Sequence, residues 1–261
     1  MKPILNVSDL SMDFGGIKAL DRLDLDVCAQ EIVALIGPNG AGKTTFFNCL
    51  TGIYLPNSGD IQLTCPQTGK KTRLNGLKPN IITEKGMART FQNIRLFPQM
   101  SVLENVMIGR HCRTRSLVLG AILRNRRTRV EEQETVDKSY AILEKVGLAA
   151  QVDEFAGNLS YGAQRRLEIG RALATEPFLL LLDEPAAGMN PQETTELVAL
   201  IRRIRDENHA ILLIEHDMKL VMTLSDRIIV MDYGQKIAQG TPAEIRGNPA
   251  VIKAYLGEEV G

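Results

Sequence analysis

The sequence predicts an α/β fold: a largely parallel sheet flanked by helices, with an antiparallel β part and an inserted helical part. The main evidence is a set of short apolar runs that do not alternate with polar residues. Continuous apolar strands of this kind are typical of parallel sheets buried on both faces. The runs are "EIVALIG" (31–37), "FLLLLDEP" (178–185), "AILLIEHD" (210–217) and "RIIVMD" (227–232).

A helix is predicted between two of these strands, over "PQETTELVALIRRIRDEN" at 191–208. Leu197, Leu200, Ile201 and Ile204 recur at helical spacing and form one apolar stripe. A strand, a helix and a further strand in this order predict a right-handed crossover.

Two regions depart from this rhythm. Residues 1–30 and 53–75 carry shorter alternating patterns with Gly and Pro, which favour an antiparallel ribbon against the main sheet, whereas residues 93–159 are mostly helical in pattern. The predicted divisions of a single domain are a nucleotide-binding core with the antiparallel part (1–92), a helical subdomain (93–159), the remainder of the core (160–234) and a C-terminal hairpin with short helices (235–261).

Composition excludes several classes of function. The 261 residues include 31 basic and 31 acidic side chains, so no net charge favours nucleic acid. We expect neither a signal peptide nor a membrane span, because the N-terminus lacks an apolar core and no apolar run approaches 18 residues. The four cysteines are scattered without metal-ligand spacing, which predicts reduced thiols: Cys28, Cys49, Cys65 and Cys112.

A glycine-rich stretch, "GPNGAGKTT" at 37–45, follows the first strand and opens a helical segment at about 43–51. It fits G-x-x-x-x-G-K-[ST], in which backbone N–H groups surround phosphate oxygens at a helix N-terminus. Lys43 is expected to reach the β and γ phosphates of a nucleoside triphosphate, and the Thr44 hydroxyl to ligate Mg²⁺. The predicted nucleotide-binding residues are Gly37, Pro38, Asn39, Gly40, Ala41, Gly42, Lys43, Thr44 and Thr45.

Two carboxylates end the strand in "LLLLDEP". A buried carboxylate at Asp183 needs a cation, and the Mg²⁺ held by Thr44 would supply one. Because successive strand residues point to opposite sides, Glu184 is expected to face the γ-phosphate, where it would orient or deprotonate the attacking water. The alternative for Glu184 is a surface carboxylate before a proline turn.

Three further residues are weaker candidates on their own. His216 follows a strand beside the expected nucleotide crevice, although a lone histidine there is more often an ordinary loop residue. Gln92, in "RTFQN", lies where a strand leaves the core for the helical part. Phe14 is either a core aromatic or a platform for a nucleotide base.

A second anion site is suggested by "NLSYGAQRRLEIGRALA" at 158–174, where a Ser and a Gly open a predicted helix. Taken in order over nearly the whole chain, the motifs above and this one resemble the ATP-binding-cassette (ABC) ATPases. The motifs are Phe14, GPNGAGKTT, Gln92, LSYGAQ, LLLLDEP, the loop 187–190 and His216. The resemblance implies an ABC cassette: a P-loop NTPase (RecA-like) core with an antiparallel β subdomain and an inserted helical subdomain.

The resemblance also implies ATP and Mg²⁺ as cofactors and a role for each weaker candidate. Phe14 would stack on adenine, and Gln92 would sense both Mg²⁺ and the γ-phosphate. Glu184 would act on the attacking water, and His216 would contact the γ-phosphate. Lys43, Glu184, His216 and Gln92 form the predicted catalytic set, and Thr44, Gln92 and Asp183 the predicted metal set.

In this family two cassettes pack head to tail, and the signature of each closes over the nucleotide of the other. The resemblance therefore assigns Ser160, Tyr161, Gly162 and Ala163 to a nucleotide bound by a second ABC ATPase subunit, in a homodimer or a heterodimer. It further implies two integral-membrane permease subunits and, indirectly, an external binding protein. The chain would then lie at the cytoplasmic face of the plasma membrane as a peripheral subunit.

A narrower resemblance, from about residue 4 to 257, is to the ATP-binding subunits of bacterial branched-chain amino-acid importers. It depends on segments such as "FGGIKALDRLDLDV", "EPAAGMNPQET" and "GTPAEIRGNPAVIKAYLG". Urea and amide importers use similar ATPases, and a soluble ABC ATPase such as an Fe–S assembly ATPase is the alternative from another class. A nucleotide kinase would have no need of LSYGAQ.

Two positions depart from the family pattern. The fifth signature residue is Ala163 in place of the usual Gln, with Gln164 displaced by one. The loop after Glu184 ends in Asn190 where Asp is common; Asn190 is predicted either to cap the next helix in a box with Glu193 or to act across the dimer.

The helical part also contains a basic stretch. No acidic residue occurs from 105 to 130. The stretch contains seven arginines and the apolar segment "SLVLGAIL". The stretch is predicted to be either a solvated face or a segment near anionic lipid or a permease loop. The arginines are Arg110, Arg113, Arg115, Arg124, Arg126, Arg127 and Arg129.

Overall fold

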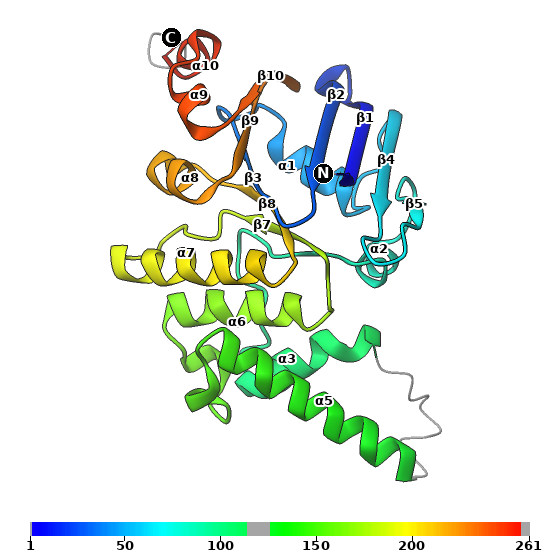
Figure 1. Cartoon of the computed structure of the whole chain (residues 1–261), viewed down its shortest axis with the longest axis vertical. Helices are drawn as coiled ribbons and strands as arrows, with labels where there is room; N and C mark the ends of the chain where they lie inside the picture. The colour runs from blue at the N-terminus through cyan, green and yellow to red at the C-terminus, as the bar shows by residue number, and fades with distance from the viewer. Residues whose placement is uncertain (1, 114–125, 257–261) are drawn as a thin grey trace.

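The computed structural model describes residues 2–113 and 126–256, which form two sheets and a helical lobe (Figure 1). The larger sheet has the order β10-β9-β3-β8-β7-β6, and the smaller one β2-β1-β4-β5. The larger sheet contains β3 (Ile32–Ile36), β6 (Met87–Arg89), β7 (Leu179–Asp183), β8 (Ala210–Ile214), β9 (Arg227–Asp232) and β10 (Gln235–Gly240). The smaller contains β1 (Pro3–Phe14), β2 (Ile17–Cys28), β4 (Ser58–Thr64) and β5 (Lys71–Arg73).

The strands from β9 to β6 run parallel, and β10 pairs antiparallel with β9 at one edge. The smaller sheet is antiparallel throughout. These arrangements confirm the predicted α/β class with a parallel sheet and an antiparallel β part.

Alternate side chains of the central strands enter two different cores. Val33 and Leu35 of β3 pack with the antiparallel sheet and α1 (Lys43–Leu50), whereas Ala34 and Ile36 pack with the helices of the opposite face. All five residues of β3 are buried, because each face of the sheet is covered. Burial of both faces explains why polar and apolar residues do not alternate in the sequence of this strand.

The remaining helices cover the second face and build the lobe, except α2 (Pro79–Glu84), whose Ile82 packs in the core beneath the antiparallel sheet. Figure 1 shows α3 and α5 at the end of the molecule away from β10, with α6 and α7 between them and the sheet. The helices are α2 (Pro79–Glu84), α3 (Val102–Arg110), η1 (His111–Arg113), α5 (Arg126–Lys145), η2 (Ala149–Gln151), η3 (Ala156–Asn158), α6 (Tyr161–Leu173), α7 (Pro191–Asp206), α8 (Met218–Leu224), α9 (Pro242–Arg246) and α10 (Pro249–Leu256).

The amphipathic helix is confirmed as α7. Its buried residues are the four of the predicted stripe, Leu197, Leu200, Ile201 and Ile204. Asn190 accepts a hydrogen bond from the Glu193 N–H (2.9 Å), and the Glu193 carboxylate accepts one from the Asn190 N–H (3.1 Å). The predicted capping box is therefore present, and it explains Asn190 without a second chain.

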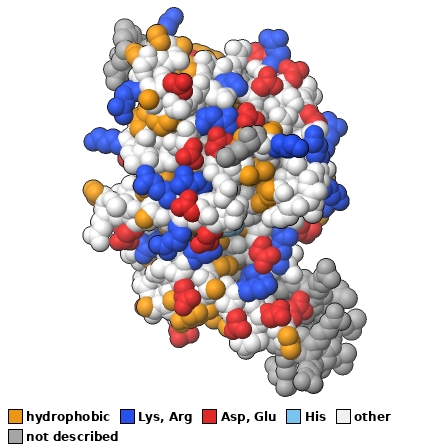
Figure 2. Space-filling view, viewed as in Figure 1, with side chains coloured by type: hydrophobic (Ala, Val, Ile, Leu, Met, Phe, Trp, Pro, Cys, Tyr) orange, Lys and Arg blue, Asp and Glu red, His pale blue; other side chains and the backbone are white. Residues whose placement is uncertain are grey.

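Among the described residues, no helix has the length and apolar character needed to cross a membrane. Acidic and basic side chains are interspersed over the face seen in Figure 2, in keeping with their equal counts. Part of the predicted basic stretch, including Arg115, Arg124 and the apolar "SLVLGAIL", lies outside the described residues.

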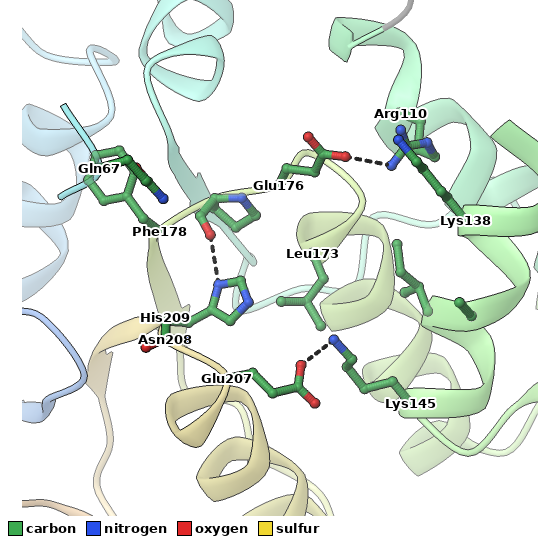
Figure 3. A pocket seen from close by; sticks show the side chains of 13 residues that line it. Gln67, Arg110, Lys138, Lys145, Leu173, Glu176, Phe178, Glu207, Asn208 and His209 are labelled. Atoms are coloured by element: carbon green, nitrogen blue, oxygen red, sulfur yellow. Dashed lines mark hydrogen bonds and ion pairs between the residues drawn. The ribbon is translucent and has the colours of Figure 1, made fainter. Parts of the chain in front are cut away.

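A cavity of about 510 Å³ lies between the lobe and the amino ends of β7 and β8 (Figure 3). Two ion pairs join its walls: Arg110 with Glu176 (3.1 Å) and Lys145 with Glu207. Phosphate-loop proteins and other open α/β folds bind ligands at the carboxyl ends of the strands. This cavity is at the opposite edge and is therefore not the nucleotide site.

His209 lines that cavity, and its Nδ1 lies 2.7 Å from the Pro177 carbonyl oxygen (Figure 3). Burial lowers the pKa of His209 below its ordinary value near 6.5 and outweighs the Pro177 carbonyl, which acts in the opposite direction. The unfolded chain therefore takes up a proton at higher pH than the folded chain. Stability from this group is present above pH 6.5 and is lost as pH falls toward the lowered pKa.

We expect the free energy of unfolding to fall on acidification from pH 7.5 to 5.5, by at most about 1.4 kcal/mol per pH unit from His209 alone. Urea denaturation at the two values measures the change. His209→Gln should reduce the difference. Equal pH dependence in the two proteins would contradict the assignment.

Candidate functional site

A cavity of about 330 Å³ lies at the carboxyl ends of the parallel strands, on the first turn of α1. Its position is the one that open α/β sheets use for ligands. Three separated segments complete it: Gln92 after β6, Glu184 after β7 and His216 after β8. The other lining residues are Ala19, Asn39–Thr45 and Ile214.

The phosphate loop is shaped by glycines that no other residue could replace. Gly37 and Gly42 have φ of 151° and 99°, and a Cβ at either would collide with a backbone carbonyl, that of Met231 or of Ala19. Lys43 is buried, and its Nζ donates to the Gly37 and Pro38 carbonyls at 2.6 and 2.8 Å. The Lys43 ammonium group therefore lies over the loop. A bound phosphate would compete with these two carbonyls as acceptor of its hydrogen bonds.

Asp183 has a cation beside it that the sequence interpretation did not foresee. The Arg89 guanidinium lies 2.7 Å from the Asp183 carboxylate, and both side chains are nearly fully buried. Arg89 also donates to the Asn48 side chain at 2.7 Å and lies over the Phe47 ring. Arg89 therefore supplies positive charge beside Asp183 from within the chain, and the assignment of Asp183 to Mg²⁺ stays a prediction.

Glu184 is not a further residue of the strand, and the expected strand alternation with Asp183 is wrong. Its φ is +47°, a left-handed conformation uncommon outside glycine, and strand β7 ends before it. This turn brings the carboxylate between two partners: it accepts from Gln92 Nε2 at 2.9 Å and lies 2.8 Å from His216 Nε2. Three segments that are distant in sequence thus hold one carboxylate over the phosphate loop.

The residues predicted to bind Mg²⁺ have a suitable set of donor atoms. Thr44 offers a hydroxyl, Asp183 a carboxylate and Gln92 an amide oxygen, and oxygen ligands of this kind are those that Mg²⁺ prefers. The Gln92 nitrogen is engaged by Glu184, which leaves its oxygen as the atom to present to a cation. Asp183 would have to exchange Arg89 for the metal, directly or through a water.

Phe14 ends β1 and is 41% exposed, so it is not a core aromatic. Its ring meets Tyr54 edge to face, with the centroids 5.2 Å apart. Tyr54 was not a sequence candidate. The exposed face of Phe14 suits base stacking, whereas Gly40 and the other loop residues are the ones expected to meet phosphate.

The signature residues open α6 and do not line the cavity of their own chain, as far as the described residues show. Ser160 is the N-cap, and its hydroxyl accepts from the Ala163 N–H at 3.3 Å. A Cβ at Gly162 would lie 2.5 Å from the Glu193 carboxylate oxygen, so a larger residue here would require the Glu193 side chain to move. Ala163 is buried, and Gln164 turns back to donate to the Leu159 carbonyl at 3.0 Å.

Glu215 is a second residue that the sequence analysis missed. It is 4% exposed, and its two oxygens accept from the Ala186 N–H (2.9 Å) and the His216 N–H (3.1 Å). Burial raises the pKa of Glu215, while these N–H groups lower it. Glu215 fixes the loop after Glu184 relative to His216. The signal available in the sequence was a carboxylate directly after a wholly apolar strand.

Comparison with known proteins places this geometry in a family. The ABC transporter family model matches residues 20–187, and a model described as a branched-chain amino acid ATP-binding cassette transporter matches residues 235–261. The chain belongs to the ABC transporter family, as an ATP-binding subunit with the transport-ATPase cassette.

Individual relatives match the sequence of this chain over almost their full length. The chain is 49% identical over 258 residues to the high-affinity branched-chain amino acid transport ATP-binding protein LivG of Escherichia coli K12, covering 98% of this chain and 99% of LivG. It is 48% identical to BraF of Pseudomonas aeruginosa with the same coverage. Among solved structures, the ADP conformation of the ATP-binding cassette MJ1267 superposes with a TM-score of 0.84 at 30% identity, covering 98% of this chain and 100% of MJ1267.

Proposed function

We propose that this chain hydrolyses ATP to power an importer of branched-chain amino acids. The observation that carries the proposal is the likeness over the whole chain to LivG and BraF, which includes the C-terminal segment matched by the branched-chain model. The nucleotide cavity supplies the chemistry, and the solute would be chosen by the partners. Those partners are a second ABC ATPase subunit, two membrane permeases and, indirectly, a binding protein.

In the nucleotide-bound chain Phe14 stacks on adenine, and the loop amides and Lys43 bind the phosphates. Bound Mg²⁺, held by Thr44, Asp183 and the Gln92 oxygen, would neutralise charge on the β and γ phosphates. Glu184 accepts a proton from the attacking water, and His216 and Gln92 fix its orientation from opposite sides. Lys43 stays with the departing phosphate oxygens and stabilises their charge.

The second half of the site comes from another cassette. Ser160 and the Gly162 backbone lie at the N-terminus of α6, where N–H groups and the helix dipole favour an anion. Since they do not line the cavity of their own chain, we assign them to the γ-phosphate bound by the partner cassette. ATP then joins the two cassettes, and its hydrolysis separates them. The permeases convert this motion into transport at the cytoplasmic face of the membrane.

The test is reconstitution of the chain with the permeases and binding protein that co-purify with it, in vesicles that contain ATP. The proposal requires ATP-dependent uptake of leucine, isoleucine or valine, abolished by Lys43→Ala. Uptake of urea or short amides in their place would overturn the choice of solute. ATP hydrolysis by a chain that co-purifies with no permease would overturn the importer role.

A further inference from the structure

One buried ion pair connects the Gln92 loop with the signature helix. Arg165 lies on α6 and is 0% exposed, so its charge requires strong partners. Its guanidinium donates to the Phe91 carbonyl (2.7 Å), the Gln92 carbonyl (2.8 Å), the Glu168 carboxylate (2.8 Å) and the Tyr161 hydroxyl (3.2 Å). Arg165 thus binds the backbone of the loop and a residue of the signature at once.

Glu168, one turn further along α6, binds the same loop from its N–H side. It is 2% exposed, and its Oε1, the carboxylate oxygen not bound by Arg165, accepts from the backbone N–H groups of Phe91 and Arg95, each at 3.4 Å. Burial raises the pKa of Glu168, and the nearby Arg165 acts against that rise. The loop is therefore held at carbonyl groups by Arg165 and at N–H groups by Glu168.

Both ends of this connection reach functional residues. On the loop, the Gln92 side chain binds Glu184 over the phosphate cavity. On the helix, the Tyr161 ring approaches Gly188 in the loop that follows Glu184; a Cβ at Gly188 would lie 3.3 Å from it. Arg165 therefore contacts both the segment that senses the chain's own nucleotide and the segment assigned to the partner's nucleotide.

We propose that Arg165 and Glu168 are positioning residues that couple the Gln92 loop to the signature helix, an inference that rests on the function proposed above. If Gln92 shifts when a γ-phosphate binds, the loop backbone shifts with it. Arg165 and Glu168 must follow, because separating them from the loop would break their buried hydrogen bonds to its backbone and leave each charge with fewer partners. Occupation of the chain's own site then sets the position of Ser160 for the other site.

Arg165→Met in the full chain removes the guanidinium and keeps an apolar side chain of similar length. Measured in a Glu184→Gln background, ATP affinity should change less than about threefold, because no phosphate-binding group is altered, whereas ATP-driven dimerisation should weaken about tenfold. Turnover by the otherwise wild-type chain should fall by a similar factor. Glu168→Gln, which keeps the shape of the side chain, should change both quantities in the same direction and serves if Arg165→Met does not fold.

Arg110→Met is the matched control, because Arg110 is also a buried arginine paired with a glutamate but does not contact the loop. A double-mutant cycle distinguishes coupling from general destabilisation. In a Gln92→Ala background, Arg165→Met should add less than about a twofold loss of turnover, whereas Arg110→Met should retain whatever effect it has alone. Independent, multiplying effects of Arg165→Met and Gln92→Ala would overturn the proposal.

A structural readout is available because the chain has no tryptophan. Asn93→Trp places a single fluorophore beside Gln92, and acrylamide quenching without nucleotide reports how firmly the loop is held. Quenching should rise with Arg165→Met and stay at the parent value with Arg110→Met. Unchanged quenching in both would overturn the connection. If quenching rose but the parent chain hydrolysed no ATP, the proposed function would be wrong and the tie between loop and helix would stand.

Discussion

Glu184→Gln is expected to lower turnover about 10³-fold while leaving ATP binding intact, and to accumulate an ATP-bound dimer. The amide keeps the shape of the side chain and its contacts with Gln92 and His216 but cannot accept the proton of the attacking water. Because the proposed mechanism separates the cassettes by hydrolysis, a chain that binds ATP without cleaving it should stay paired. Single-turnover ATPase assays and size-exclusion chromatography with light scattering measure the two effects.

The matched control is Glu207→Gln, the same change in a carboxylate that pairs with Lys145 at the opposite edge of the sheet. It should retain wild-type turnover and remain monomeric under the same conditions. Retention of more than a fifth of wild-type turnover by Glu184→Gln would contradict the assigned role. A monomer in ATP and Mg²⁺ would show that two copies of this chain do not pair and that the partner is a different cassette.

The motif residues could be placed from the sequence because their chemistry depends on local order. A strand, a glycine loop and a helix in immediate succession define the phosphate site. Each of these elements can be predicted from residues that are close together in the sequence. The two-face burial of β3 and the stripe of α7 follow from apolar periodicity alone. The capping box at Asn190 is also a local pattern, since its two partners are three residues apart.

The residues that were missed act through contacts between distant segments. Arg89 meets Asp183 only because β6 lies beside β7, and a three-residue strand carries almost no periodic signal. The sequence pattern places Arg165 and Glu168 on a polar, solvent-facing side of α6, yet the Gln92 loop covers both residues. The backbone at Glu184 was also misjudged, because a positive φ at a non-glycine residue depends on surrounding contacts and not on local propensity.

The Arg89–Asp183 pair would compete with metal binding at this site. A metal ion at Thr44 and a guanidinium at Asp183 both place positive charge on the same carboxylate, so binding one weakens the other. Arg89 has alternative partners in the Asn48 side chain and the Phe91 ring, which lies 5.3 Å from its guanidinium carbon. These contacts would keep Arg89 partnered in its buried position if Asp183 ligated the metal as proposed.

Ser160→Arg is expected to lower turnover by about 10² or more without changing ATP binding by the phosphate loop of the same chain. Ser160 caps α6 and does not line the cavity of its own chain, so the added guanidinium would block only the surface offered to a partner. Ser101→Arg is the matched control, because Ser101 likewise caps a helix, α3, with its side chain. Both changes remove an N-cap worth about 1 kcal/mol, so a loss of turnover confined to Ser160→Arg separates the two roles.

Mixing two inactive variants shows in which chain the signature acts. In a dimer of one Ser160→Arg chain and one Lys43→Met chain, the intact phosphate loop of the first faces the intact signature of the second. One complete site is then formed, and turnover should return to between about a tenth and a half of the wild-type value, well above either variant alone. The mixture is informative once Glu184→Gln has shown that two copies pair. No recovery in such mixed dimers would mean that Ser160 serves the nucleotide of its own chain.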